Sequence, residues 1–394
     1  MMKKKPAVVL GNLMMGRCFT LADIPYIGIT TKNDKRLFYS KACIEGHVLE
    51  NPAKNEAATL AGLLEIGKRH GGGLPLFYTN DAQLKMVNSH ADTLRDYFTF
   101  LLPDKKLIDS SLDKHLFNDM VKEYDLPTPP TFHKDEVTGT DMLDFPVIIK
   151  PTSRIHWFNS QVIKELGAQQ KILLINNAAE FENYRRKIDA ENIDYIVQKY
   201  VPGTEAQILS FHSFFDENSE PLAYYCGRKI RTYPNDYGLS CSLRLIKHPE
   251  MAAISLDVLK RLRFKGPIKI DYKLDEKSGK LYLLELNPRY NMWHYIGARA
   301  GINLPALAYH YLIDGVAGKV QTDYETDIKW ISGIQEWFTF RDMKKQGLIS
   351  TGQWLASLSG RRIYQTWAGD DLKPVMYAAW DTFKGGLRKV KKLF

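Results

Sequence analysis

Three polar side chains that could bind a metal ion or a phosphate group are spaced two positions apart in the apolar segment 283–289. They are the carboxylate of Glu285, the amide of Asn287 and the guanidinium of Arg289. In a β-strand, residues two apart point to the same face. We therefore expect these three side chains to converge on one side of a strand while Leu284 and Leu286 face the core.

A second strand-like run ends in Asp271, and a polar turn at residues 275–279 separates it from the first run. If the two runs pair as a hairpin, Asp271 lies beside Glu285 and Asn287. Two carboxylates and an amide suit Mg²⁺, which binds through a few carboxylates together with the phosphates of a nucleotide. Taken alone, the segment is equally well interpreted as an ordinary hairpin with a polar outer face.

Two further segments carry groups that suit a nucleotide. Residues 145–149 form a buried-strand pattern that ends in Lys150, which could bind phosphates as a point charge. A lysine at a strand end that merely reaches solvent is a common alternative. A second strand pattern runs from Tyr195 through Gln198 into a Pro-Gly turn, with Glu205 just beyond it.

In this order and spacing, the segments resemble the motifs of the ATP-grasp ligases over residues 106–318. The resemblance implies that the protein uses ATP and Mg²⁺, with two metal ions for which Mn²⁺ can substitute. In the related ligases, the segment that corresponds to residues 198–205 is a hinge that contacts adenine and begins with a glutamate. Gln198 departs from this pattern, although its amide can still accept the adenine amino proton. The nucleotide-binding residues implied are Lys114, Lys150, Gln198, Lys199, Val201 and Glu205, the metal ligands are Asp271, Glu285 and Asn287, and the catalytic residues are Arg289, Lys269 and Arg231.

The same resemblance gives several of these residues a role. Lys114 and Lys150 would bind phosphates, Glu205 would hold the ribose hydroxyls, and Arg289 would stabilise the transferred phosphoryl group or an acyl phosphate. Arg231 belongs to the basic run at residues 227–231, which could grip the γ-phosphate or a substrate carboxylate. A solvated basic strand edge is an equally good interpretation of any single residue in that run.

The N-terminal part looks like the group of ATP-grasp carboxylate–amine ligases that includes D-aspartate ligase. Three short segments at residues 8–11, 23–28 and 37–40 carry this likeness. The fold class implied is α/β, an ATP-grasp fold with an N-terminal parallel α/β (pre-ATP-grasp) domain, a small mobile lobe and a larger metal-binding lobe.

The function implied is an ATP-dependent carboxylate–amine ligase that forms an amide bond through an acyl phosphate and releases ADP and phosphate. Its partners would be a small-molecule carboxylate and an amine, joining an amino acid to a cell-envelope or peptide-like acceptor. Two alternatives remain open. The first is another acceptor on the same fold, as in a carboxylate–thiol ligase, a carboxylase or a kinase, and the second is a non-catalytic nucleotide-binding scaffold.

Composition narrows the class of protein. With 394 residues and 44% hydrophobic content, the chain can bury a substantial core in two or three domains. Four cysteines without a CxxC pair fit a reducing cytoplasm. No apolar run approaches the length of a transmembrane helix, and no zinc-finger spacing or ribonucleoprotein motif suggests nucleic-acid binding. We expect a cytoplasmic protein, with a peripheral position at the inner face of the membrane as the alternative.

The pattern along the chain divides it into four parts. Residues 1–105 alternate strand-like and helix-like segments, as in a parallel α/β domain. Prolines 127, 129 and 130 mark a linker into the small mobile lobe, about 128–198, within a part that spans 106–198. Residues 199–330 would form the lobe with the Mg²⁺ site. A loop over the phosphates is expected at 152–161, where His156 is more readily explained as a solvated or packing residue than as a catalytic one.

The last part, residues 331–394, holds eleven Lys and Arg against five Asp and Glu, so +6 of the net charge of +9 lies there. Its apolar residues recur at helical spacing from Met376 to Phe394. A basic amphipathic helix with Trp and Phe suits the surface of an anionic membrane, so 376–394 could make peripheral membrane contact. The alternatives are a helix packed on its own core or against the second subunit of a homodimer.

Overall fold

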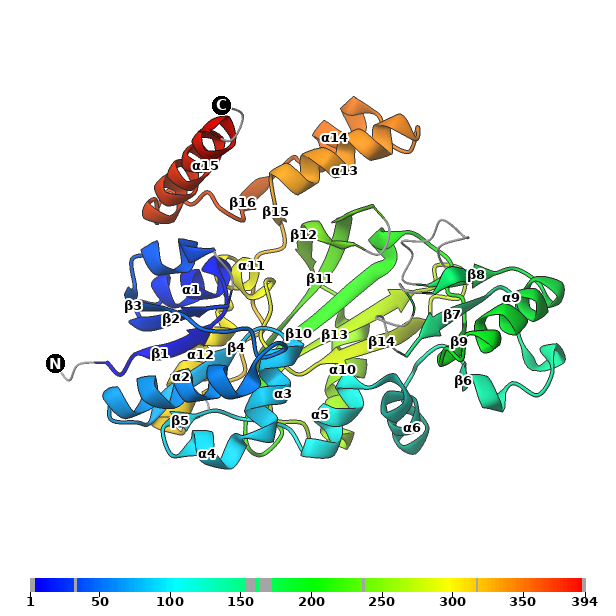
Figure 1. Cartoon of the computed structure of the whole chain (residues 1–394), viewed down its shortest axis with the longest axis horizontal. Helices are drawn as coiled ribbons and strands as arrows, with labels where there is room; N and C mark the ends of the chain where they lie inside the picture. Colours follow the sequence, from blue (N-terminus) through cyan, green and yellow to red (C-terminus); the bar gives the residue numbers. More distant parts are fainter. Residues whose placement is uncertain are drawn as a thin grey trace.

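The computed structural model describes residues 4–391 except 32–33, 153–156, 158–159, 163–171, 236–237 and 317. Within these residues the chain forms three β-sheets, seen in Figure 1 as an N-terminal part in blue, a small sheet in teal and green, and a large sheet in green and yellow. The last sixty residues return along one side of the molecule in orange and red.

The N-terminal sheet is parallel and has the strand order β3-β2-β1-β4-β5. Its strands are β1 (Ala7–Leu10), β2 (Tyr26–Thr30), β3 (Cys43–Val48), β4 (Leu74–Tyr78) and β5 (Phe98–Thr99), with helices α1 (Leu13–Thr20), α2 (Glu56–Arg69), α3 (Asp81–Ser89) and α4 (Ala91–Arg95) between them. The expected parallel α/β domain is therefore confirmed. The helical stretch after β4 is divided in two, because His90 leaves helical geometry and separates α3 from α4.

The small sheet is antiparallel, in the order β6-β9-β7-β8, and two helices precede it. The elements are α5 (Lys105–Leu112), α6 (Lys114–Tyr124), β6 (Thr131–His133), β7 (Val147–Pro151), β8 (Leu173–Ile175), α9 (Ala178–Ala190) and β9 (Tyr195–Lys199). One face of this sheet packs on α9 through Val147, Ile149 and Val197. The alternating residues Ile148, Lys150, Ile196 and Gln198 therefore share the opposite face.

The large sheet has the order β14-β13-β10-β11-β12-β15-β16. Its strands are β10 (Ile208–Phe215), β11 (Pro221–Tyr233), β12 (Leu239–Ile246), β13 (Gly266–Leu274), β14 (Leu281–Asn287), β15 (Ile328–Ile331) and β16 (Arg361–Tyr364). The helices that accompany it are α10 (Pro249–Arg261), α11 (His294–Arg299) and α12 (Leu304–Asp314).

Two apolar cores lie on opposite faces of the large sheet. On one face, Leu243, Leu245 and Trp330 pack with α11, α12 and helix α1 of the N-terminal part. On the other, Leu209 and Tyr272 pack with α10 and with the helices α5 and α6. Because the first core includes residues of both the N-terminal sheet and the large sheet, burial of apolar surface holds these two parts together.

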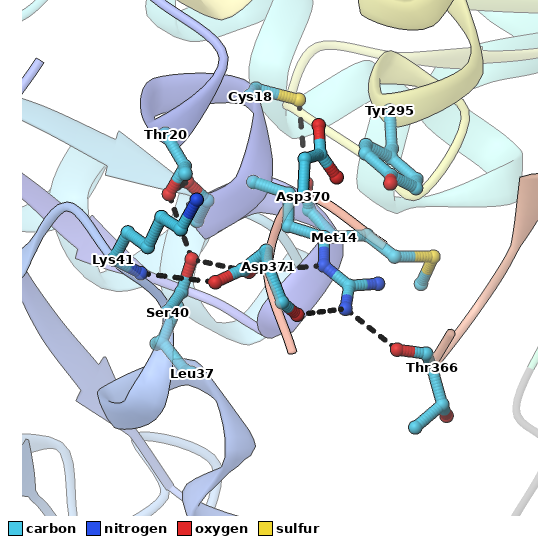
Figure 2. A network of polar contacts seen from close by, with 12 residues as sticks. Met14, Cys18, Thr20, Leu37, Ser40, Lys41, Tyr295, Thr366, Asp370 and Asp371 are labelled. Carbon is cyan, nitrogen blue, oxygen red and sulfur yellow. Dashed lines mark hydrogen bonds and ion pairs between the residues drawn. The ribbon is translucent and has the colours of Figure 1, made fainter. Parts of the chain in front are cut away.

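The C-terminal segment returns to the N-terminal part through a buried ion pair. Helices α13 (Ile334–Lys345) and α14 (Thr351–Ser357) precede β16, and α15 (Lys373–Lys391) follows it. Asp371 accepts hydrogen bonds from the Arg17 guanidinium at 3.2 Å, from the Ser40 hydroxyl at 2.8 Å and from the Lys41 backbone N–H at 3.1 Å. Figure 2 shows Asp371 at the centre of these contacts, with Thr366 beside it on the same returning segment.

Helix α15 turns an apolar face away from the protein. Tyr377 stacks on Tyr39 at 4.3 Å, whereas Met376, Trp380 and Phe383 are 69%, 54% and 59% exposed. The expected stripe is therefore present over these residues but is not packed on the chain's own core. Across the described residues, none of the helices combines the length and the apolar character needed to cross a membrane.

Candidate active site

The expected hairpin forms between β13 and β14, and its register places Asp271 directly opposite Glu285 and Lys269 directly opposite Asn287. A β-bulge shifts the register between Asp271 and Tyr272, so that Tyr272 pairs with Leu283. The expectation that Leu284 faces the core is wrong for this reason. Leu283 is fully buried in the core instead, and Leu284 is half-buried.

The three alternating polar side chains converge, as the spacing predicts. The Asn287 amide donates to Glu285 Oε1 at 2.6 Å, and Arg289 Nη2 donates to Asn287 Oδ1 at 2.9 Å. Arg289 also forms an ion pair with Asp81, the first residue of α3. A chain of polar contacts therefore connects the end of β14 to the N-terminal part.

Asp271 is buried and charged. Burial alone would raise its pKa, but the ammonium groups of Lys269 and Lys229 and the hydroxyl of Ser210 hold that pKa well below its usual value. Lys269 is hydrogen-bonded to one carboxylate oxygen and Ser210 to the other. The carboxylate is thus ready to bind a cation at any physiological pH.

Lys150 lies on the face of the small sheet opposite to α9, where its ammonium donates to Gln198 Oε1 at 2.6 Å. The Gln198 amide in turn donates to Thr131 Oγ1 at 2.7 Å. Burial, followed by the like charge of Lys114, lowers the pKa of Lys150 to about 8, and the carboxylate of Glu285 opposes both effects. Because Glu285 is on the large sheet, its effect on Lys150 indicates that Lys150 of the small sheet lies near this end of β14.

Lys114 is the first residue of α6. The side chain of Asp113 caps this helix by accepting hydrogen bonds from the backbone N–H groups of His115 and Leu116. The Lys114 ammonium donates to the carbonyl of Pro151, the last residue of β7. Lys114 and Lys150 therefore meet at the same strand end, which is the arrangement expected of two phosphate-binding lysines.

The segment 199–205, in which the nucleotide-binding residues Lys199, Val201 and Glu205 were expected, leaves the end of β9 in a turn. The Lys199 backbone N–H donates to Pro130 at 2.9 Å, and its side chain is ion-paired with Asp144 outside the site. Val201 is buried, and Gly203 has a φ of +118°, which favours glycine. Glu205 begins a 3₁₀ turn, and the preceding carbonyl accepts from Lys273 at 2.7 Å.

Arg231 does not lie free in the site. Its guanidinium forms a buried ion pair with Glu336 of α13, and the two side chains are 6% and 2% exposed. The register of β11 shifts between Lys229 and Arg231, which breaks the alternation that would place both side chains on one face. Lys229 is the member of the basic run whose charge acts on Asp271. To bind a phosphate or a substrate carboxylate, as expected from the sequence, the Arg231 guanidinium would have to exchange Glu336 for that ligand.

Three residues of the site were not predicted from the sequence. Ser210 of β10 contacts Asp271, and Asp81 of α3 is paired with Arg289; neither position carries a local signal in the sequence. His212 is fully buried opposite Lys269 in the sheet, stacked between Tyr225 at 4.9 Å and Trp293 at 5.1 Å. Burial, followed by the nearby His294 and Lys269, lowers the pKa of His212 well below its usual value.

The donor set fits a magnesium ion that is shared with a nucleotide. Within the part of the chain that the structure describes, no group of three or more His, Cys, Asp or Glu side chains could hold a metal by itself. Asp271, Glu285 and Asn287 supply two carboxylates and one amide on one face, which leaves positions for phosphate oxygens. His156, in the expected phosphate loop, lies outside the described residues, whereas Trp157 is buried in the core of the small lobe.

Solved structures with the same architecture are ATP-grasp enzymes. An L-amino acid ligase from Bacillus licheniformis superposes with a TM-score of 0.56 at 14% identity, covering 79% of this chain and 74% of that one. N5-carboxyaminoimidazole synthetase from Staphylococcus aureus gives 0.57 at 13% identity, with 78% of each chain covered. A biotin carboxylase domain from Hydrogenobacter thermophilus, solved with MgADP, ADP and bicarbonate, gives 0.58 at 15% identity over 83% of this chain and 74% of that one.

The chain therefore has the ATP-grasp fold, and the expected fold class is confirmed. The resemblance to the carboxylate–amine ligases extends to a particular relative. D-aspartate ligase of Enterococcus faecium is 22% identical over 265 residues, which are 64% of this chain and 61% of that protein. The chain thus covers less than two thirds of the length of this relative. No family model matches the chain.

Proposed function

We propose that the protein is an ATP-dependent carboxylate–amine ligase. The observation that carries the proposal is the meeting of two lysines and a carboxylate–amide cluster across two sheets of an ATP-grasp fold. Lys150 and Lys114 lie at the end of the small sheet, Asp271 and Asn287 lie on the large sheet, and Glu285 acts electrostatically on Lys150. The name of the D-aspartate ligase relative supports carbon–nitrogen bond formation.

In this proposal each cluster has one task. Lys150 and Lys114 bind phosphate oxygens, the hinge at Gln198–Lys199 and Val201 contacts adenine, and Glu205 holds the ribose. Asp271, Glu285 and Asn287 hold Mg²⁺, with two ions for which Mn²⁺ substitutes, and the metal supplies charge neutralisation of the phosphates when bound. Lys269 keeps Asp271 ionised and, with Arg289, stabilises charge on the group being transferred.

The reaction needs no nucleophilic side chain. An oxygen of the substrate carboxylate attacks the γ-phosphorus, the bond to the bridging oxygen breaks, and ADP leaves. The amine then attacks the carbonyl carbon of the acyl phosphate, loses its proton, and expels phosphate as the amide forms. Positioning and electrostatic stabilisation supply the rate enhancement.

The acceptor is the less constrained half of the proposal. The names of the L-amino acid ligase among the structural neighbours and of the D-aspartate ligase relative support an amino-acid substrate. The acceptor that we propose for it is a cell-envelope or peptide-like molecule. Two of the neighbours are carboxylation enzymes by name, which keeps a different acceptor as the second candidate.

The test is Mg²⁺-dependent release of phosphate from ATP, screened across amino acids paired with carboxylate acceptors. Glu285→Ala should reduce the rate of phosphate release by about a hundredfold or more, because it removes a proposed metal ligand. Glu250→Ala, an exposed carboxylate on α10, is the matched control and should change nothing.

Release that needs both a carboxylate and an amine, and that is lost only in Glu285→Ala, would support the ligase. Release with bicarbonate or a carboxylate alone would replace it with another acceptor. Binding of ATP without turnover of any pair would contradict catalysis and favour a nucleotide-binding scaffold.

We further propose that the domain boundaries follow the four parts expected from the sequence, 1–105, 106–198, 199–330 and 331–394. The small lobe, about 128–198, would close over the nucleotide and exclude water from the acyl phosphate. Amide hydrogen exchange with and without a non-hydrolysable ATP analogue measures this directly. Unchanged protection in β7 and β9 would contradict closure.

Helix α15 supports a peripheral contact of residues 376–394 with an anionic membrane. Trp380 and Phe383 are exposed on it, and Lys384 lies over the Trp380 ring at 5.0 Å. Phe383→Ser should weaken sedimentation with phosphatidylglycerol vesicles, whereas Ile44→Ser, a residue of β3 with the same exposure, should not. Loss of a dimer in Phe383→Ser, measured by light scattering, would instead assign this face to a homodimer.

A further inference from the structure

Four cations stand in one row across the large sheet. Arg228 of β11 is the register partner of Arg244 of β12, Arg244 pairs with Lys329 of β15, and Lys329 pairs with Arg362 of β16. Directly opposed residues of neighbouring strands point to the same face. The row therefore presents four positive charges side by side across four consecutive strands, which Figure 1 shows running to the edge of the sheet at β16.

The row lies on the face of the sheet opposite to the proposed active site. Leu243, Leu245 and Trp330, the sequence neighbours of the row, are buried in the core shared with the N-terminal part. Asp271 lies on that same side, because its register partners lead through Ser210 and Gly227 to Leu245. A nucleotide bound at Asp271 therefore cannot contact the row.

Neighbouring acids within the described chain offset the charge of the row only in part. Among the described residues, none of the four side chains forms an ion pair with a carboxylate. Glu276 and Asp327 are the acids that act on the row from neighbouring segments, and Glu276 accepts a hydrogen bond from Gln207 at 2.8 Å. Within the described part of the chain, Lys329 donates to the carbonyl of Ser359, and the Arg228 Nε is buried with no hydrogen-bond partner.

The like charges of the row disfavour one another's charged forms. Burial lowers the pKa of Arg228, and Arg244 lowers it further. Burial likewise lowers the pKa of Lys329. The carboxylate of Asp327 opposes this effect, and the charges of Arg244, Arg231 and Arg362 add to it. Like charges placed directly opposite each other destabilise a sheet. Four like charges in register therefore lower the stability of the sheet, and a bound anion would restore that stability.

We propose that this row, Arg228–Arg244–Lys329–Arg362, is a second anion-binding site, and that its ligand carries two or more phosphate-class groups. Adjacent strands are about 4.8 Å apart, so the row spans about 14 Å, which suits several anionic groups in line and exceeds a single phosphate. A soluble polyphosphorylated ligand and a row of lipid headgroups offer the same chemistry. The site does not depend on the proposed ligase activity.

The experiment compares the full-length protein with Arg244→Gln/Arg362→Gln, which removes two exposed charges of the row. Tripolyphosphate binding is measured by titration calorimetry with saturating ADP to occupy the nucleotide site. Flotation with vesicles of phosphatidylglycerol and phosphatidylcholine tests the lipid source. The matched control is Lys68→Gln/Lys85→Gln, which removes two exposed charges from α2 and α3.

We expect at least about tenfold weaker binding of one probe in the row variant, with the control unchanged and the affinity falling as salt rises. Binding of tripolyphosphate points to a soluble ligand, and binding of vesicles alone points to a headgroup. The melting temperature of the row variant should not fall, and Arg244→Lys/Arg362→Lys, which keeps the charges, should retain binding. Absence of binding to both probes, or equal loss in the control, overturns the proposal.

Discussion

The surroundings of Lys150 and Asp271 lower the pKa of both side chains, with different consequences for nucleotide binding. Asp271 remains ionised because Lys269 and Lys229 outweigh its burial, so its charge is constant over physiological pH. Lys150 has a pKa of about 8 because burial and Lys114 disfavour its ammonium form. An anion placed beside Lys150 would stabilise that form, so phosphate binding should be tied to its protonation.

The substitution Lys150→Met should therefore weaken nucleotide binding and raise the stability of the folded state. At pH 7 the wild-type ammonium is charged in both states, and burying it disfavours folding, so the variant should melt at a higher temperature. Between about pH 8 and the ordinary value of 10.5 the unfolded chain holds the extra proton, and wild-type stability should rise with pH. ADP affinity, measured by calorimetry, should fall about tenfold or more at pH 7.

The control for this variant is Lys187→Met, an exposed lysine on α9 of the same lobe. It should alter neither the ADP affinity nor the pH dependence of stability. ADP binding by Lys150→Met that matched wild type would remove Lys150 from the nucleotide site.

Single residues of the site were predictable where one strand carries the pattern. The spacing of Glu285, Asn287 and Arg289 predicted their convergence, because alternation is a local property of a strand. Ser210 and Asp81 could not be found in this way, since they meet the hairpin only through the order of strands and the packing of α3.

At the scale of elements, two bulges decide which side chains face the site. The bulge in the β13–β14 hairpin puts Leu283 rather than Leu284 into the core, and the one in β11 separates Lys229 from Arg231. Strict alternation predicts neither, because an inserted residue shifts every position beyond it. The hairpin, its turn and the parallel N-terminal sheet were predictable, since each has a local pattern of apolar and turn residues.

The central part of β11 also depends on a residue without a side chain. A Cβ built on Gly227 would lie 2.3 Å from Trp293 Cζ3, so Trp293 can pack over the sheet only if position 227 is glycine. Gly227→Ala should destabilise the protein by about 1–3 kcal/mol through overpacking, measured by urea denaturation. It should also lower any ATP turnover, because Trp293 stacks on His212 beside Lys269.

Gly318→Ala provides the comparison, because a Cβ there meets no atom within 4 Å. It should leave both stability and turnover unchanged. A Gly227→Ala variant as stable as wild type would mean that Trp293 has room to move.

At the scale of the whole molecule, the returning C-terminal segment is fixed to the N-terminal part by one buried charge pair. The side chains of Arg17 and Asp371 are 1% and 2% exposed, and Arg17 also donates to the carbonyls of Gln365 and Thr366. Because these partners are about 350 residues apart, no local pattern in the sequence could have predicted the contact.

Asp371→Ala should destabilise the protein by about 3–5 kcal/mol, because it leaves the Arg17 guanidinium buried without its counter-charge. The neighbouring Asp370 is the matched control. It pairs with Arg299 but is 48% exposed, so Asp370→Ala should lose no more than about 1 kcal/mol. Chemical denaturation of both variants measures the difference, and equal losses would show that the Arg17–Asp371 pair contributes no more than a surface pair.

The Arg17–Asp371 pair also sets the order in which the protein can be completed. During synthesis on the ribosome, helix α1 emerges about 350 residues before its counter-charge, which arrives only after residue 371 has left the exit tunnel. Until then the N-terminal part has to keep Arg17 hydrated or held by a chaperone. Helix α1 is thus completed only after residue 371 has emerged, so a chain that stalls before that point exposes its defect at α1, far from the break.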